Sequence, residues 1–344
     1  MIRAFHWRPI ARGCRIGALC ALALAPRWAG ASPIAGAAAV LSADPDDQLS
    51  EIVVEGRGPR FVAPTRRDSI GRIWAPVYIN GRGPFRLVLD TGATQSAITR
   101  TVASILGLSL DQSPPLLLRG VTGVAKVPTV QVQTLSVGDL TVNEPILPIV
   151  PDAMGGADGI LGTAGLFDKR VRIDFRHDLI TITYSRNQRP GRGFEAFHFK
   201  ADAATPIIID ADVGGVPAKA IIDTGGQLTI ANLALRNALS RSGDWHRGTP
   251  DTIAGATLAI QDGEIMATPA IDLGSIQIVE TAVTYSDLMI FSHWQLLRKP
   301  AILVGMDALG LLDSLVIDYK EHELDMRIRS GRPHGHSDYR GVIP

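Results

Sequence analysis

The sequence predicts an all-β protein made of two similar halves, with short helices between the strands. The first observation is composition: the apolar segments are short and rich in valine and isoleucine, and 35 glycines and 22 prolines provide turns. The second is a triplet that occurs twice, as Asp90-Thr91-Gly92 and as Asp223-Thr224-Gly225. The third is that the same landmarks surround both triplets in the same order, which indicates a duplicated domain.

Each triplet follows a predicted β-hairpin. In the first half, residues 76–89 (PVYINGRGPFRLVL) read as strand, turn and strand, and Asp90 follows at once. In the second half, residues 207–222 (IIIDADVGGVPAKAII) repeat the pattern around two glycines, and Asp223 follows. A carboxylate at the end of an apolar strand is costly to desolvate, so its double occurrence indicates a pair of carboxylates that act together.

The landmarks also agree downstream of the triplets. Each half has a glycine-bearing turn between strand-like segments, then a strand pair, an apolar-apolar-glycine element with a short helix candidate after it, and a hairpin. The paired ranges are 118–130 with 252–260, 133–142 with 270–280, 160–162 with 303–305, and 171–182 with 315–328.

The same pattern predicts the domain boundaries. A turn-rich, basic stretch at 185–200 is the expected linker, so the halves span 71–184 and 201–330. Residues 32–70 form an N-terminal segment, which is a pro-segment, an extra strand or a tether. Residues 331–344 read as a polar, disordered tail.

The first 31 residues are typical of a secretory signal peptide. Four arginines precede an apolar run at 18–26 that is too short to span a bilayer, and small residues before Ala31 suit cleavage there. We therefore expect a periplasmic or secreted protein without a stable membrane span after cleavage. An uncleaved anchor and a lipoprotein attached through Cys20 are the alternatives.

Cleavage would remove both cysteines, Cys14 and Cys20, and with them disulfides, a cysteine nucleophile and cysteine-based metal sites. Five of the 34 basic residues lie in the signal, which leaves 29 basic against 34 acidic residues. A mildly acidic chain without a basic run argues against nucleic acid as a partner.

The two triplets and their surroundings resemble the aspartic peptidases. The similarity covers about residues 73–183 and 205–328 and includes the run from Asp90 to Ser96 and the element 160–162. Ala93 after the first triplet is closer to the retroviral and retropepsin-like bacterial members than to pepsin, although both halves lie on one chain, as in pepsin. The resemblance implies two retropepsin-like β-barrel lobes of the acid-protease fold, with the active site between them.

The resemblance also implies the roles of individual residues. Asp90 and Asp223 would share one proton, as the aspartic proteases are known to do, and would activate a water that hydrolyses a peptide bond. The supporting loop residues would be Thr91, Gly92, Thr224 and Gly225, and the substrate-binding flap would be Gly120, Val121, Thr122 and Gly123. The expected partner of this monomer is a peptide or protein substrate, and neither metal nor cofactor is required.

Two other functions remain open at this stage. Gly226 stands where serine, threonine or alanine is usual, which favours a catalytically degenerate protein of the same fold that only binds peptides. A glycosidase could also use two carboxylates, although the triplet context makes this the weaker alternative. The histidines are scattered and lack the spacing of a zinc site.

Overall fold

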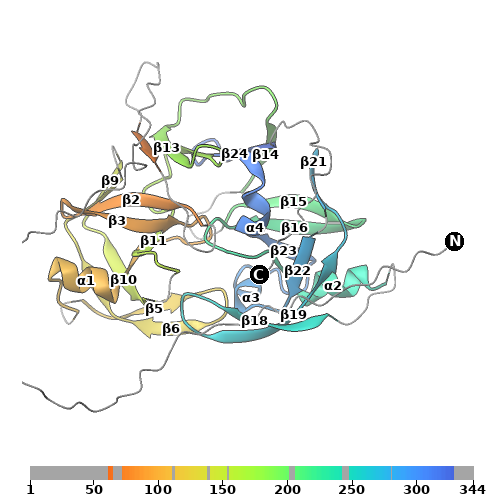
Figure 1. The fold of residues 1–344 in the computed structure, drawn as a ribbon, viewed down its shortest axis with the longest axis horizontal. Coiled ribbons are helices and arrows are strands. Elements are labelled where there is room, and N and C mark those ends of the chain that lie inside the picture. The colour runs from red at the N-terminus through yellow and green to blue at the C-terminus, as the bar shows by residue number, and fades with distance from the viewer. Residues whose placement is uncertain are drawn as a thin grey trace, which may run out of the picture. The chain divides into compact units, whose positions relative to one another are not determined.

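A computed structural model of the protein describes residues 61–64, 72–110, 113–137, 140–152, 155–200, 206–241, 248–279 and 281–328, and these residues belong to one compact unit. The described chain is mostly β, which confirms the predicted all-β class (Figure 1). The predicted signal peptide, the tail and most of the N-terminal segment lie outside the described residues.

Eight strands of the first half form one sheet. They are β2 (Trp74–Ile79), β3 (Arg82–Leu89), β4 (Ala97–Thr99), β7 (Thr129–Gln131), β8 (Thr134–Val137), β9 (Leu140–Asn143), β10 (Ile146–Val150) and β11 (Gly159–Leu161). Their order across the sheet is β7-β10-β4-β11-β3-β2-β8-β9. A separate hairpin of β5 (Leu116–Arg119) and β6 (Val124–Val127) and helix α1 (Arg100–Leu106) complete this half.

Nine strands of the second half form another sheet. They are β15 (Ile208–Val213), β16 (Val216–Ile222), β17 (Ile230–Ala231), β18 (Thr249–Ala254), β19 (Ile260–Thr268), β20 (Ile271–Leu273), β21 (Ile276–Ile278), β22 (Thr281–Tyr285) and β23 (Ala301–Val304). Their order is β18-β19-β22-β17-β23-β16-β15-β20-β21. Helices α2 (Leu233–Leu239), α3 (Met289–His293) and α4 (Met306–Leu309) lie between these strands in the sequence.

The two sheets have the same connectivity around the triplets. Strand β3 pairs in parallel with β11, which pairs antiparallel with β4, and β4 pairs in parallel with β10. In the second half β16, β23, β17 and β22 repeat these three pairings with the same directions. Each aspartate therefore leaves its sheet at the end of an equivalent strand.

The hairpins before the triplets turn as the sequence predicts. Asn80 and Gly81 have φ of 52° and 70°, and Gly214 and Gly215 have φ of 57° and 86°. Two consecutive residues with positive φ make the type I′ turn, whose twist matches that of the flanking strands. Asparagine and glycine tolerate this region of φ, which explains why both hairpins carry these residues.

A third sheet of six strands is shared by both halves. It contains β1 (Phe61–Pro64), β12 (Lys169–Asp174), β13 (Leu179–Tyr184), β14 (Glu195–His198), β24 (Leu312–Asp318) and β25 (Glu323–Ile328). Strand β12 of the first half pairs antiparallel with β24 of the second, so backbone hydrogen bonds join the halves. In Figure 1, β13, β24 and β14 lie above the other two sheets.

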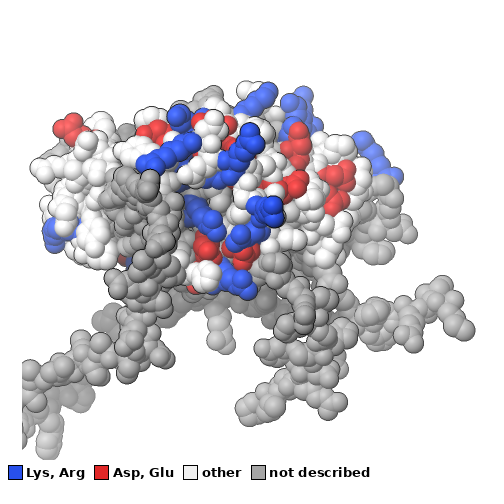
Figure 2. Space-filling view, turned by 90° about the horizontal axis from the view of Figure 1, so that it is seen from above, with Lys and Arg blue, Asp and Glu red and all other residues white. Residues whose placement is uncertain are grey.

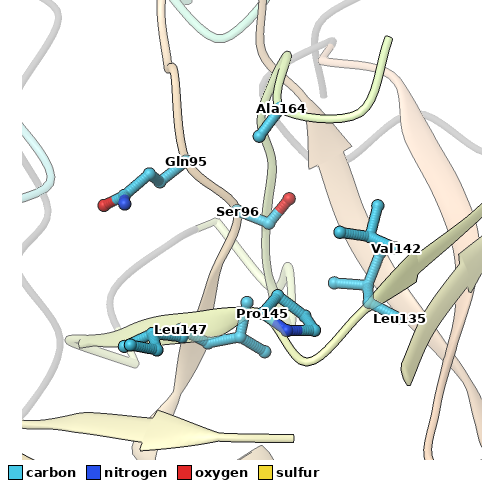
Figure 3. Close-up of a pocket in the computed structure, with 8 residues that line it drawn as sticks. Gln95, Ser96, Leu135, Val142, Pro145, Leu147 and Ala164 are labelled. Carbon is cyan, nitrogen blue, oxygen red and sulfur yellow. The ribbon is translucent and has the colours of Figure 1, made fainter. Parts of the chain in front are cut away.

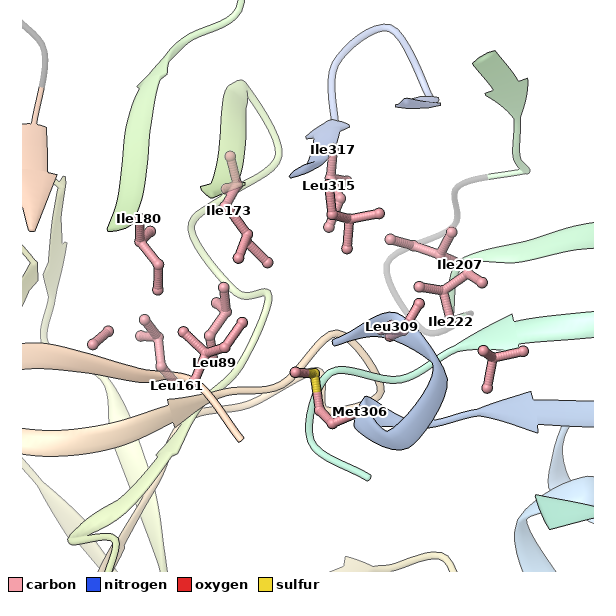
Figure 4. Packing of buried hydrophobic residues seen from close by; sticks show 14 of the residues in the cluster. Leu89, Leu161, Ile173, Ile180, Ile207, Ile222, Met306, Leu309, Leu315 and Ile317 are labelled. Atoms are coloured by element: carbon pink, nitrogen blue, oxygen red, sulfur yellow. The ribbon is translucent and has the colours of Figure 1, made fainter. Parts of the chain in front are cut away.

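Apolar side chains fill the space beneath the six-stranded sheet. Figure 4 shows Ile173 and Ile180 from its first-half strands above Leu89 and Leu161, and Leu315 and Ile317 from β24 beside Ile207, Ile222 and Leu309. All belong to one buried cluster that spans both halves. The strands that end at Asp90 and Asp223 thereby pack against the six-stranded sheet.

Two segments differ in secondary structure from the expectation, and the N-terminal segment takes one of the forms that the sequence left open, an extra strand. The predicted linker contains β14, which pairs antiparallel with β25, with Ala196 and Phe197 among its paired residues. The N-terminal segment contributes β1, an edge strand on β13. The helix candidate after Gly162 is a series of turns in which Gly165 has φ 90°, whereas α4 forms after Gly305.

Charged side chains of both signs occur together on the surface seen from above in Figure 2. Within the six-stranded sheet, Arg170 pairs with Asp318 at 3.2 Å and with Asp325 at 2.9 Å. No helix among the described residues is long and apolar enough to cross a membrane.

Candidate active site

The structure brings Asp90 and Asp223 together from the ends of β3 and β16. The amide of Asp90 donates to the carbonyl of Leu161 at 3.0 Å, and the amide of Asp223 donates to that of Val304 at 3.1 Å. The apolar-apolar-glycine elements thus fix the backbone at which each aspartate begins its loop. The two carboxyl groups are close enough to share a hydrogen bond.

The two threonines lock the loops to each other. The hydroxyl of Thr91 accepts from the amide of Thr224, and the hydroxyl of Thr224 accepts from the amide of Thr91, each at 3.1 Å. Each hydroxyl also donates across the interface at 2.7 Å, from Thr91 to the carbonyl of Ile222 and from Thr224 to that of Leu89. Both threonines are buried, so these four bonds are shielded from water and hold the aspartates in register.

Backbone amides surround the carboxylates. The amide of Gly92 donates to Asp90 Oδ1 at 2.8 Å. The amides of Gly225 and Gly226 donate to Asp223 Oδ1 at 2.9 and 3.1 Å. Gly226, the unusual residue of the second motif, therefore supports Asp223 through its backbone.

Glycine is required where the two loops meet. A Cβ on Gly92 would lie 3.1 Å from Asp223 Oδ1 and 3.2 Å from Asp90 Oδ1. A Cβ on Gly225 would lie 2.7 Å from Asp90 Oδ1 and closer still to the other carboxyl atoms. Each triplet glycine thus makes room for the aspartate of the opposite loop, which is a stronger constraint than turn geometry.

The environment favours the protonated form of one carboxyl group. Burial and then the negative charge of Asp223 raise the pKa of Asp90 to about 8, against the amides of Gly92 and Ala93, which lower it. Burial also raises the pKa of Asp223, against hydrogen bonds from the two glycine amides and from Asp90. Both shifts favour a protonated carboxyl group in the pair at pH values where a free aspartate is ionised.

Two neighbours of the pair were not expected from the sequence. Arg72 is buried, and its positive charge lowers the pKa of Asp223. Burial, and next the charge of Asp90, raise the pKa of the Tyr319 hydroxyl. An arginine just before a strand and a tyrosine in a hairpin turn usually face solvent, so nothing in the local pattern marks them.

A second layer of polar contacts supports each loop. The hydroxyl of Ser96 accepts from the amide of Gly162 at 3.1 Å, and the hydroxyl of Thr229 accepts from the amide of Gly305 at 3.2 Å. Thr229 was missed, although a signal exists: Ser96 and Thr229 both lie six residues after their aspartate.

The predicted flap is the β5–β6 hairpin, with its tip at 120–123. The tip is closed by a 2.8 Å bond from the amide of Gly120 to the carbonyl of Gly123. A second hairpin, formed by β18 and β19 with its tip at 255–259, faces it from the other half (Figure 1). A Cβ on Gly120 would lie 3.1 Å from Thr257, and a Cβ on Gly255 would lie 2.8 Å from Thr122 Oγ1, so the tips meet reciprocally.

Each hairpin tip packs on apolar side chains of the opposite half. Val121 packs against a buried cluster of the second half that includes Ile221 and Leu303, and its carbonyl accepts from the amide of Ile290 at 3.3 Å. Ala256 packs against a smaller cluster of the first half, which contains Val88, Ala97, Val150, Ala157 and Ile160. The two clusters include residues of β16 and β3, the strands that end at Asp223 and Asp90. Each hairpin tip therefore contacts apolar side chains next to one of the two aspartates.

Within the described residues, no group of three or more histidine, cysteine, aspartate or glutamate side chains could hold a metal ion.

Comparisons with known proteins bear on the first half of the chain. A search among curated proteins finds no match. Residues 75–164 match the model of a family described as aspartyl protease, and this range contains Asp90, its loop, the β5–β6 hairpin and the element 160–162. The stretch from 75 to 164 is thus similar to an aspartyl protease domain.

Proposed function

We propose that the protein is an aspartic endopeptidase that hydrolyses peptide bonds with a water activated between Asp90 and Asp223. The observation that carries this proposal is geometric: two carboxyl groups from equivalent loops lie within hydrogen-bonding distance, in surroundings whose burial and charge raise the pKa of Asp90 to about 8. Such a pair contains a base and an acid at the same pH, which hydrolysis of an amide requires.

In this mechanism the ionised carboxylate takes one proton from the bound water while the water oxygen attacks the substrate carbonyl carbon. The protonated carboxyl group donates its proton to the carbonyl oxygen, which gives a neutral gem-diol. In the breakdown, the newly protonated carboxyl group donates its proton to the amine nitrogen while the other carboxylate takes a proton from a gem-diol hydroxyl. The C–N bond breaks, and the pair again holds one proton. Arg72 favours the ionised form of Asp223, and so the assignment of Asp223 as the base.

The two halves are, in this proposal, two homologous lobes at 71–184 and 201–330, and both hairpins cover the substrate. Their reciprocal contacts support this, because each tip reaches the apolar cluster of the other half. The proposed setting is the periplasm or the exterior of the cell, reached through the signal at 1–31.

Cleavage of a peptide library by the purified protein, with and without pepstatin, tests the proposal. Pepstatin-sensitive cleavage is the expected result. Peptide binding without any cleavage would instead identify the degenerate, peptide-binding alternative.

Activity should follow a bell-shaped pH profile with its optimum at roughly pH 5 to 7, because only the singly protonated pair is active. The rate falls as pH rises through about 8, where Asp90 loses its proton. It falls on the acidic side as Asp223 becomes protonated, at a pKa above its usual value. A plot of kcat/KM against pH with any cleaved peptide measures both limbs.

Ala93→Ser should shift the profile towards acid, since an added hydroxyl bond favours the ionised carboxylate. Thr94→Ala, at the exposed neighbouring position, is the control and should leave both limbs in place. An optimum near pH 2 to 3 in the wild type would contradict the raised pKa.

Gly255→Ala should weaken catalysis by keeping the hairpin tips apart. The added Cβ would lie 2.8 Å from Thr122 Oγ1 and 2.9 Å from Val121 Cγ2, so one tip has to move. We expect a loss of roughly 10- to 100-fold in kcat/KM. Gly191→Ala, whose Cβ would meet the Phe194 ring at an ordinary 3.4 Å, is the matched control. Equal kinetics for the two variants would show that the second hairpin does not cover substrate.

A further inference from the structure

A half-open pocket of about 220 Å³ lies beside the loop that follows Asp90 (Figure 3). Its walls are apolar and come from β8, β9 and β10, with Leu135, Val142 and Leu147 among them. Ser96 provides a polar corner, and Ala164 also lines the pocket there. In Figure 3 the Ser96 hydroxyl points across the pocket towards Val142, whereas the amide of Gln95 points away from it.

The second half shows which residue occupies the position equivalent to Ala164. The amide of Ala164 donates to the carbonyl of Thr94 at 2.9 Å, and the amide of Asp307 donates to that of Gln227 at 3.1 Å. The amides one residue earlier form another equivalent pair of bonds, each 2.9 Å, to the carbonyls of the fourth residue of each triplet motif. Ala164 therefore occupies the backbone position that Asp307 occupies in the second half.

The Asp307 carboxylate binds the residue equivalent to Ser96. Its Oδ2 accepts from the amide of Thr229 at 3.0 Å, and its Oδ1 accepts from the Thr229 hydroxyl at 2.7 Å. Thr229 and Ser96 are equivalent because each hydroxyl accepts the amide of the glycine that ends its apolar-apolar-glycine element. In the second half, a carboxylate thus satisfies two donors at once.

The first half lacks that carboxylate. Ala164 ends at Cβ, and the turn around Gly165 replaces the helix that carries Asp307. Ser96 is only 8% exposed. Among the described residues, its hydroxyl accepts from Gly162, but no group accepts from that hydroxyl or from the Ser96 amide. Two donors in an apolar, sheltered corner are costly without an acceptor.

We propose that this pocket binds a small carboxylic acid with an apolar body, whose carboxylate accepts from the Ser96 amide and hydroxyl as Asp307 does from Thr229. An apolar cavity of 150 Å³ is enough to hold benzene, so about 220 Å³ suits a body of about six carbons. The apolar walls would contact this body and the open side would admit it. The site is separate from the carboxyl pair and does not depend on the proposed peptidase activity.

Occupation of the pocket would also steady the loop of Asp90. The Ser96 hydroxyl holds the amide of Gly162, and the preceding carbonyl, of Leu161, accepts the amide of Asp90. A ligand that binds Ser96 therefore stabilises the backbone on which Asp90 is mounted.

Hexanoate is the probe, added to the full chain at pH 7 and followed by calorimetric titration and by thermal unfolding. We expect saturable binding and a rise in Tm of about 3 °C at ten times Kd. Hexan-1-amine, which has the same body and the wrong charge, should give neither. Absence of hexanoate binding up to tens of millimolar would overturn the proposal.

Ala164→Asp locates the site. The added carboxylate should accept hydrogen bonds from the amide and the hydroxyl of Ser96. It should therefore raise Tm without ligand and weaken hexanoate binding at least tenfold. Thr141→Asp adds the same charge at an exposed position of β9 and should leave binding unchanged. Equal binding by wild type and Ala164→Asp would place hexanoate elsewhere and overturn the assignment.

The second half offers a converse test. Asp307→Ala should lower Tm by exposing the same two donors on Thr229, and acetate should restore part of the loss where acetamide does not. If acetate and acetamide act alike, a free carboxylate does not take this position, and the proposal for Ser96 falls with it.

Discussion

Asp90→Asn and Asp223→Asn should each reduce cleavage by at least about 10⁴-fold, and the double variant should be hardly worse than either. The reason is that the proposed mechanism needs one ionised and one protonated carboxyl group in contact, and each substitution removes one of the two groups that accept and donate protons. Asparagine retains the oxygen that accepts the Gly92 or Gly225 amide, so the loop geometry is preserved. Steady-state kinetics on one cleaved peptide measures the three losses.

Asp90→Asn should at the same time stabilise the fold at neutral pH. The pKa of Asp90 is raised from its usual 3.8 to about 8, so the folded state binds more protons than the unfolded state between these values. Stability therefore falls as pH rises through this window, and the uncharged amide removes that dependence. We expect a gain of roughly 2–4 kcal/mol at pH 7 and little change at pH 4, measured by urea unfolding.

Asp210→Asn is the control for both measurements, because Asp210 is exposed and pairs only with Lys219 at the surface. It should change neither rate nor stability appreciably. Full activity in Asp223→Asn together with loss in Asp90→Asn would show that the second half does not take part in catalysis.

Gly225→Ala should reduce kcat/KM by roughly 100-fold or more, although the variant retains both aspartates. The added Cβ would overlap the carboxyl group of Asp90, at 2.7 Å from Oδ1, so Asp90 or the second loop has to shift. A displacement of the order of 1 Å at the reacting groups costs about this factor. The shift also separates the carboxyl groups, and the alkaline limb of the pH profile should move to lower pH as their coupling weakens.

Gly92→Ala provides the internal comparison. Its Cβ would approach the two carboxylates at 3.1 and 3.2 Å, which needs only a few tenths of an ångström of relief, so its loss of activity should be smaller. Gly191→Ala, in the segment between the halves, should have no effect. A larger loss of kcat/KM in Gly92→Ala than in Gly225→Ala would contradict the geometry of the two loops.

The sequence by itself determined the local features. The hairpin turns at 80–81 and 214–215 follow from residues that tolerate positive φ. The repeated triplet with its landmarks also identified Asp90 and Asp223 as equivalent positions. These inferences hold because they depend on neighbours close in the chain.

Only the tertiary structure decided which distant residues are in contact. The four threonine bonds join residues 131 to 135 positions apart. The burial of Arg72, the meeting of the two hairpin tips and the close approach of Gly225 to Asp90 depend on the docking of the two halves. Ala164 and Asp307 occupy equivalent backbone positions, which only the hydrogen bonds of the folded chain reveal. Such contacts arise from packing between distant segments, and side-chain pattern along one strand or turn does not encode them.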